Sequence, residues 1–196
     1  MSHRQLLIAV YLLLACCGVL PSTVHALGQP YFESVVGTAD ISNGIITVMA
    51  QDRSGLIWMG TPEGLYSFDG QRLRAFRNRP DDPSSLGDDY IRALLPHSDG
   101  RLWVATQGAG LSVYDPRSDS FEQFRPQPGD PDSLPSLAAL SLAEAPDGDV
   151  WVGFGNNGLA RWDSGDRRFH VTDNASSGAD VLHDATVRCL LFDRVG

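Results

Sequence analysis

The sequence predicts an all-β protein, a β-propeller built of four-stranded antiparallel blades, from three observations. Tryptophan recurs as Trp58, Trp103 and Trp151, at steps of 45 and 48 residues. Each of these tryptophans follows a turn glycine by three residues, and a Gly-Leu pair follows each tryptophan strand. Repeats of about 40 to 45 residues that each contain four short strands are typical of propellers.

Turns rich in Asp and Gly divide the first repeat into strands, which we expect at 45–51, 56–61, 64–69 and 72–77. The second strand is apolar on both faces, so both must be covered, as they are when sheets stack face to face. The copies predict blades at 45–77, 90–125 and 138–171, with the start of a fourth at 186–196. Because three and a half blades leave a ring open, we expect a truncated N-terminal piece of a longer protein.

Residues that recur in register have structural interpretations. The tryptophans pack between sheets, a glycine two residues later lets the next sheet approach, and Gly and Asp form the later turns. These positions are Trp58, Trp103, Trp151, Gly60, Gly153, Gly64, Gly110, Gly158, Asp69, Asp115 and Asp163.

Residues 1–26 have the pattern of a signal peptide. The uncharged run Leu6–Leu20 follows Arg4 and leads to a small-residue site ending at Ala26, and it is shorter than the ~20 residues of a spanning helix. We therefore expect a periplasmic or extracellular protein that is cleaved near Ala26. A lipoprotein acylated at Cys16 and an uncleaved anchor are the alternatives.

The remaining N-terminal segment, 27–44, contains a candidate ring-closing strand at 31–36. Tyr31 lies fifteen residues before Ile46, the spacing found between Phe76 and Ile91. Cys189 aligns with small residues of the other repeats, so we expect it to be buried.

Composition excludes several functions. The formal charge of −9 argues against a nucleic-acid surface, which needs clustered cations. All fifteen basic residues are arginine, which excludes a phosphate-loop lysine and a Schiff-base lysine within these residues.

No motif predicts a cofactor. Residues 153–158 match G-x-G-x-x-G, but a strand follows where dinucleotide binding needs a helix. The acidic turns leave calcium as an alternative to simple turn chemistry, although no D-x-D-x-D-G loop is present. The histidines lack metal-ligand spacing, and we expect no metal site.

The candidate ligand-binding residues lie where the repeats differ. Arg92 and Arg188 take equivalent positions on inner strands, where the other repeats have Thr47 and Leu140. Inner strands line a propeller's channel, and arginine there could bind a carboxylate or sulfate through two hydrogen bonds. The alternative is that these arginines pair with acids such as Asp89 or Asp184. Weaker candidates for the same face are Tyr90, Asn156 and Asn157.

The succession D-x-x-G-x-I/L-W-x-G-T, G-L-x-x-Φ-D and D-P-x-S-L resembles the two-component regulator propeller repeat of bacterial sensors. It departs at Ala105 and Phe154, which replace Gly and Thr, and at His97 and Ala145, which replace Asp. The resemblance implies a non-catalytic sensory segment that binds an unknown small molecule or carbohydrate. The parent would be a homodimer anchored in the inner membrane through a downstream region, with a histidine kinase or diguanylate cyclase as output.

Two other classes remain open. A secreted propeller enzyme, such as a lyase, would need a cluster of His, Tyr or acidic residues at the ends of the inner strands. A protein-binding scaffold would use the same fold without a small-molecule site.

Overall fold

The computed structural model describes residues 41, 44–171 and 185–193. The chain divides into two units, Met1–Ser34 and Val35–Gly196, and all the described residues lie in the second. The expected signal peptide and the candidate strand at 31–36 therefore lie outside the described residues. Among the described residues, no helix is long and apolar enough to cross a membrane.

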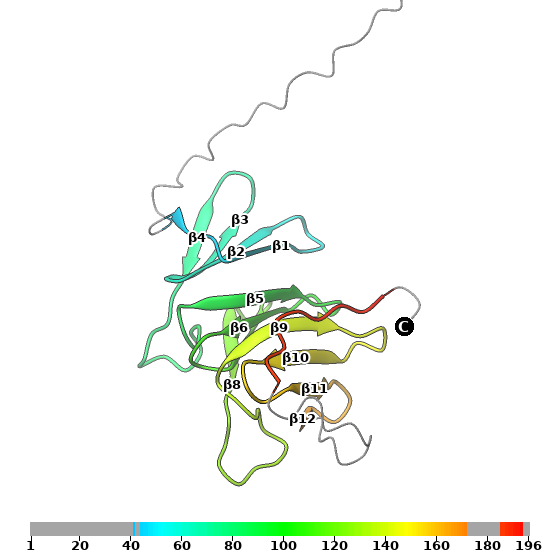
Figure 1. Cartoon of the computed structure of the whole chain (residues 1–196). Helices are drawn as coiled ribbons and strands as arrows, with labels where there is room; N and C mark the ends of the chain where they lie inside the picture. Colours follow the sequence, from blue (N-terminus) through cyan, green and yellow to red (C-terminus); the bar gives the residue numbers. More distant parts are fainter. Residues whose placement is uncertain (1–40, 42–43, 172–184, 194–196) are drawn as a thin grey trace, which may run out of the picture. The chain divides into compact units, whose positions relative to one another are not determined.

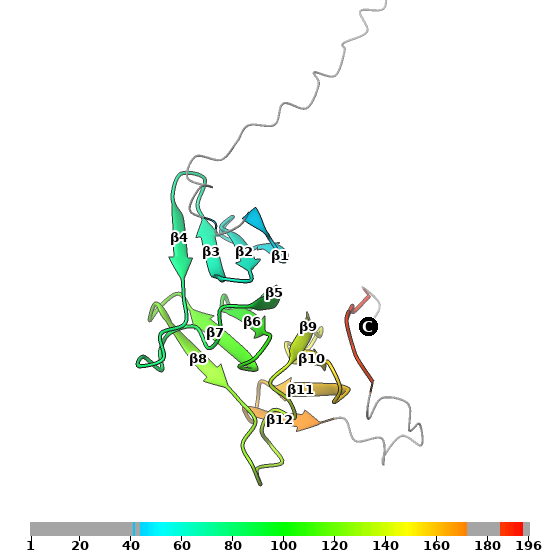
Figure 2. The ribbon, with the colours of Figure 1, turned by 60° about the vertical axis from the view of Figure 1, so that its left-hand side comes forward.

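Three four-stranded antiparallel sheets follow one another along the chain (Figure 1), which confirms the predicted propeller architecture. Blade 1 contains β1 (Val48–Gln51), β2 (Ile57–Thr61), β3 (Gly64–Phe68) and β4 (Leu73–Phe76). Blade 2 contains β5 (Ile91–Pro96), β6 (Leu102–Thr106), β7 (Leu111–Asp115) and β8 (Ser120–Phe124). Blade 3 contains β9 (Ala139–Glu144), β10 (Val150–Phe154), β11 (Leu159–Asp163) and β12 (Arg168–Val171). Figure 2 shows each sheet running from β1, β5 or β9 at one edge to β4, β8 or β12 at the other.

The first hairpin of each blade closes with the same backbone turn. In blade 1 the Gly55 amide donates to Asp52 O at 3.0 Å and the Asp52 amide to Leu56 O at 3.0 Å. Gly55 has a φ of 90°, a conformation that glycine adopts without the steric cost of a Cβ. The turn therefore depends on the glycine, which recurs as Gly100 and Gly148, and not on Asp52, which His97 and Ala145 replace in the other blades.

Adjacent blades pack face to face through buried apolar side chains. One core cluster joins Trp58 and Leu65 of blade 1 to Ile91 and Leu102 of blade 2, and a second joins blade 2 to blade 3 around the fully buried Trp103. A Cβ at position 60 would lie 2.6 Å from Ile91 Cγ2 of the next blade. Glycine is therefore needed there for the sheets to approach.

The segment 185–193 runs along blade 3 without forming a strand. The Val187 amide donates to Phe154 O at 2.9 Å, and Ser141 Oγ donates to Val187 O at 3.0 Å. No second strand pairs with it among the described residues, which leaves its outer side uncovered. Cys189, in this segment, is exposed. The expectation that it is buried is therefore wrong.

Candidate functional site

A β-bulge marks the inner strand at the position where the repeats differ. In blade 2, Ile91 pairs with Thr106 and Ala93 with Ala105, which leaves Arg92 as an extra residue. The register of β9 and β10 shifts in the same way around Leu140. A bulge frees one residue from the ladder and turns its side chain, and bulges are over-represented beside functional sites. The differing position is therefore also the one without a role in sheet pairing.

The exposed Arg92 side chain is held by two neighbours. Its Nε donates a hydrogen bond to Gln107 Oε1, and its Cζ lies 4.5 Å from the centroid of the Tyr90 ring. Such stacking on an aromatic ring orients a guanidinium, and an Nε bond leaves the two terminal nitrogens for a bidentate anion.

The predicted alternative, pairing with Asp89, is not what the structure shows. Asp89 Oδ1 accepts a hydrogen bond from the Asn78 amide at 2.7 Å. Within the part of the chain that the structure describes, Arg92 forms no ion pair with a carboxylate. Asp184, the predicted partner of Arg188, lies outside the described residues.

Two loops are joined beneath this arginine. The Gln107 amide donates to Tyr90 O at 2.9 Å, and the Gly108 amide donates to Asp88 Oδ2 at 2.8 Å. The connection that precedes β5 is thus tied to the turn between β6 and β7. We call Asp88, Tyr90, Arg92 and Gln107 the Arg92 cluster.

Gln107 was missed in the sequence analysis, although the alignment of repeats contains the signal. At this turn position the other repeats have Pro62 and Gly155, neither of which has a side-chain hydrogen-bond acceptor. Gln107 thus supplies a hydrogen-bond acceptor in the one complete repeat that has an arginine at the variable position, which indicates that it is a partner for Arg92.

The other predicted residues lie one blade further along. Asn156 and Asn157 are exposed in the turn between β10 and β11, which is equivalent to the turn containing Gln107. Arg188 is exposed in the segment after blade 3, next to Val187, which is bound to that blade. The structure brings Tyr90 and Arg92 together but gives no contact between Arg188 and either asparagine.

The recurring residues have structural surroundings. Trp58 and Trp103 are buried and Trp151 is half-buried. The amides of Gln71 and Arg72 donate to Asp69, Arg117 to Asp115, and Gly165 to Asp163. The backbone hydrogen bonds from Arg72 and Gln71 hold the pKa of Asp69 below its usual value. The remaining positions are glycines. Gly64, Gly110 and Gly158 have φ values of 133°, 75° and 62°. A Cβ at Gly153 would lie 2.7 Å from Val187 Cγ1.

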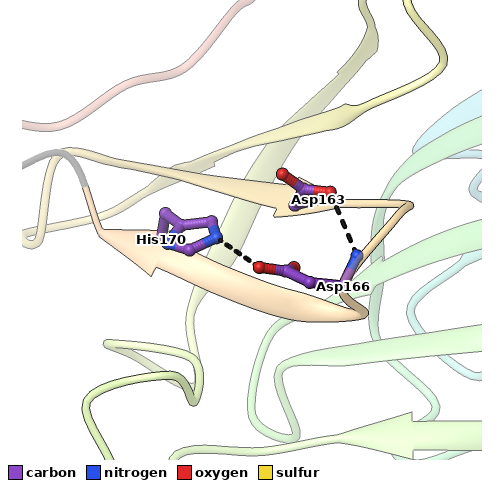
Figure 3. A group of neighbouring side chains, drawn as sticks. All are labelled: Asp163, Asp166 and His170. Atoms are coloured by element: carbon purple, nitrogen blue, oxygen red, sulfur yellow. Dashed lines mark hydrogen bonds and ion pairs between the residues drawn. The ribbon is translucent and has the colours of Figure 1, made fainter.

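One group has the donor atoms of a metal site, at the hairpin of β11 and β12 (Figure 3). Ligand atoms of Asp163, Asp166 and His170 lie within 4.8 Å of one another. Asp163 Oδ1 already accepts hydrogen bonds from the amides of Gly165 and Asp166, and Arg161 lies 3.6 Å from its Oδ2. His170 and Asp166 form an exposed ion pair at 3.4 Å. Turn capping and ion pairing account for these contacts without a metal, so we assign no metal centre to the group.

The repeated turns and the stacked four-stranded blades define a β-propeller. Residues 40–63 and 85–108 match the sequence model of the two component regulator propeller. Two segments of the chain therefore match two component regulator propeller repeats, and the resemblance is confirmed.

Known proteins share this fold. The extracellular domain assigned to the hybrid two component system BT3049 of B. thetaiotaomicron superimposes with a TM-score of 0.67 at 24% identity, over 74% of this chain and 20% of that one. The corresponding domain of BT4673 gives 0.53 at 23% identity, over 64% and 16%. Histidine kinase P4 of Formosa agariphila is 34% identical over 55 residues, which are 28% of this chain and 4% of the kinase. The chain thus spans a fifth or less of each relative, and the structural likeness shows the fold alone.

Proposed function

We propose that this chain is an extracytoplasmic, ligand-binding propeller segment of a bacterial signal-transduction receptor. The names of its relatives support this, since two are extracellular domains of two component systems and one is a histidine kinase. The pattern of a signal peptide in residues 1–26 supports the location. The parent would carry a histidine kinase or a diguanylate cyclase as output.

The observation that carries the proposal is the bulged, exposed and oriented Arg92. Its guanidinium is positioned by Gln107 and Tyr90 and forms no ion pair with the described residues. A protein with a formal charge of −9 offers many carboxylates, so an arginine held apart from them is available for an external anion. The ligand would be a small molecule or carbohydrate that carries a carboxylate or sulfate.

Signalling would follow from differential binding. A ligand that binds one arrangement of a receptor homodimer more tightly shifts the population of receptors towards that arrangement. The change in subunit packing would then be transmitted across the membrane. The Arg92 cluster includes residues from two loops and one inner strand, so a bound anion would add a contact between loops that hydrogen bonds already join.

A binding screen tests the proposal. The chain is screened by thermal shift against neutral and uronic-acid oligosaccharides, and hits are titrated against wild type, Arg92→Gln and Arg117→Gln. Loss of a charge-assisted hydrogen bond, about 1.5–3 kcal/mol, should weaken binding to Arg92→Gln by about tenfold to a hundredfold. Arg117→Gln is the matched control, because Arg117 is also exposed but lies in the turn between β7 and β8. A ligand that binds Arg92→Gln as tightly as wild type would contradict the assignment of the site.

A further inference from the structure

A cavity lies between blades 1 and 2, at the opposite end of their inner hairpins from the Arg92 cluster. It has a volume of about 340 Å³, within the range of small-molecule pockets. The turn between β1 and β2 forms one wall, and the turn between β5 and β6 forms the facing wall. Its apolar lining consists of Leu56, Trp58, Pro96, Leu102, Tyr114 and Pro116.

The two aromatic rings of this cavity are fixed in place. Trp58 and Tyr114 pack edge to face, with ring centroids 5.3 Å apart. Trp58 Nε1 donates to Asp52 Oδ2 at 2.9 Å, and the Tyr114 hydroxyl donates to Asp119 Oδ1 at 2.7 Å. Both rings are nearly buried, with 3% of Trp58 and 6% of Tyr114 exposed, so most of the carbon surface open to the cavity belongs to Leu56, Pro96 and Pro116. This surface suits an apolar or aromatic ring.

Charge at the rim selects an anion. Arg53 lines the cavity and donates from Nη1 to Ser98 O of blade 2 at 3.0 Å. It forms no ion pair with any carboxylate in the described ranges. Arg101, also at the rim, is bound to Asp99 at 2.7 Å. Arg53 therefore supplies the cation that a ligand can use.

The carboxylate of Asp52 does not oppose this. Its Oδ1 accepts from the amides of Ser54 and Leu56 at 2.9 and 3.1 Å, and its Oδ2 accepts from Trp58. Both oxygens are thus directed into the turn, where donors surround them. The negative charge of Asp52 is compensated inside blade 1, whereas the charge of Arg53 lies at the rim.

We propose that this cavity binds a small aromatic carboxylate. Its ring lies between the two turns, against Leu56, Pro96 and Pro116 and beside the edge of Trp58, and its carboxylate binds the Arg53 guanidinium. The site is distinct from the Arg92 cluster and does not depend on the function proposed above. Since both blades form its walls, an occupied cavity fixes the joint between blades 1 and 2.

The test uses indole N–H signals of the ¹⁵N-labelled chain, which has four tryptophans. Benzoate is titrated as the probe, with benzyl alcohol as a neutral molecule of similar size. Benzoate should shift the Trp58 signal saturably and leave that of Trp162 in place, and benzyl alcohol should bind about tenfold more weakly. No shift at Trp58, or equal binding of the two compounds, would overturn the proposal.

Three variants complete the test. Arg53→Gln should reduce benzoate affinity to that of benzyl alcohol, whereas Arg72→Gln, an exposed arginine outside the cavity, should retain it. Pro116→Trp should fill the cavity from its exposed edge and abolish binding of both compounds. Dispersed indole signals from the other tryptophans show that each variant is folded. Benzoate binding that survives Pro116→Trp, or falls equally in Arg72→Gln, would place the site elsewhere.

Discussion

Blades 1 and 2 close their first hairpins with the same backbone turn but use its first side chain differently. In blade 1, Asp52 caps the turn and accepts the Trp58 indole N–H at 2.9 Å. In blade 2 the equivalent residue is His97, whose Nε2 donates to Gly148 O of blade 3 at 3.0 Å. The indole N–H of the fully buried Trp103 then has no hydrogen-bond partner among the residues that the structure describes.

The difference shows two uses of one position. Asp52 accepts the indole N–H of its own blade. His97 instead links blades 2 and 3, and the Trp103 indole N–H is left without an acceptor among the described residues. The link has further contacts, since His97 Nε2 lies 3.5 Å from Glu144 Oε1 and the Glu144 carboxylate accepts from the Ser98 amide at 3.1 Å. Turn chemistry can therefore be exchanged for inter-blade contact without changing the strand register.

The largest expected effect on stability comes from the buried tryptophan that blades 1 and 2 have in common. Trp58→Ala and Trp103→Ala should each destabilise the chain by about 3–5 kcal/mol, because both side chains are buried in inter-blade clusters. Trp151→Ala should cost less, since Trp151 is half-buried. Urea unfolding followed by circular dichroism measures the three values. Equal losses at all three positions would mean that burial does not govern the role of the repeated tryptophan.

A smaller effect on stability should distinguish blade 1 from blade 2. Trp58→Phe and Trp103→Phe remove the same atoms, but Trp58→Phe also removes the bond to Asp52. We expect Trp58→Phe to be more destabilising by about 1–2 kcal/mol, because blade 2 has no such bond to lose. The two unfolding free energies under identical conditions decide this. The reverse order would show that the Trp103 N–H is satisfied in solution.

The smallest effect is a dependence on pH. Burial raises the pKa of Asp52, but hydrogen bonds from Ser54 and Trp58 outweigh it and hold this pKa below its usual 3.8. A lowered pKa in the folded state means that the stabilisation is present above the unfolded pKa and is lost as pH falls through the folded pKa. The stability difference between wild type and Asp52→Asn should therefore shrink below about pH 4. Urea midpoints measured from neutral to acidic pH test this, and a constant difference would contradict it.

The parts of the fold that repeat were predictable from the sequence. Spacing of tryptophans and glycines predicted four-stranded blades, because hairpin turns and apolar strands are local patterns. Strand limits were less certain, and β1 begins at Val48 rather than at Ile45. The exposure of Cys189 was missed because alignment assumes that each repeat has the same neighbours, which the segment after blade 3 lacks among the described residues.

The sites were only partly predictable, because they depend on contacts between blades. Comparison of the repeats proposed Arg92 and Tyr90 as candidates, but it could not show that Tyr90 contacts the arginine or that Gln107 orients it from another loop. It interpreted His97 as a departure from the repeat and not as a link to blade 3. Nor could it reveal the cavity beside Trp58, which two blades form together.

The bulge at Arg92 has a consequence for how such a protein changes over time. A residue outside the hydrogen-bond ladder and outside the core can be replaced with little effect on folding, since exposed substitutions away from such features usually change stability by less than about 0.5 kcal/mol. The position is therefore nearly free of the selection that maintains the blade. Under the proposed function, mutations there would be tested by recognition alone, and a single scaffold could acquire new specificities without first losing its fold.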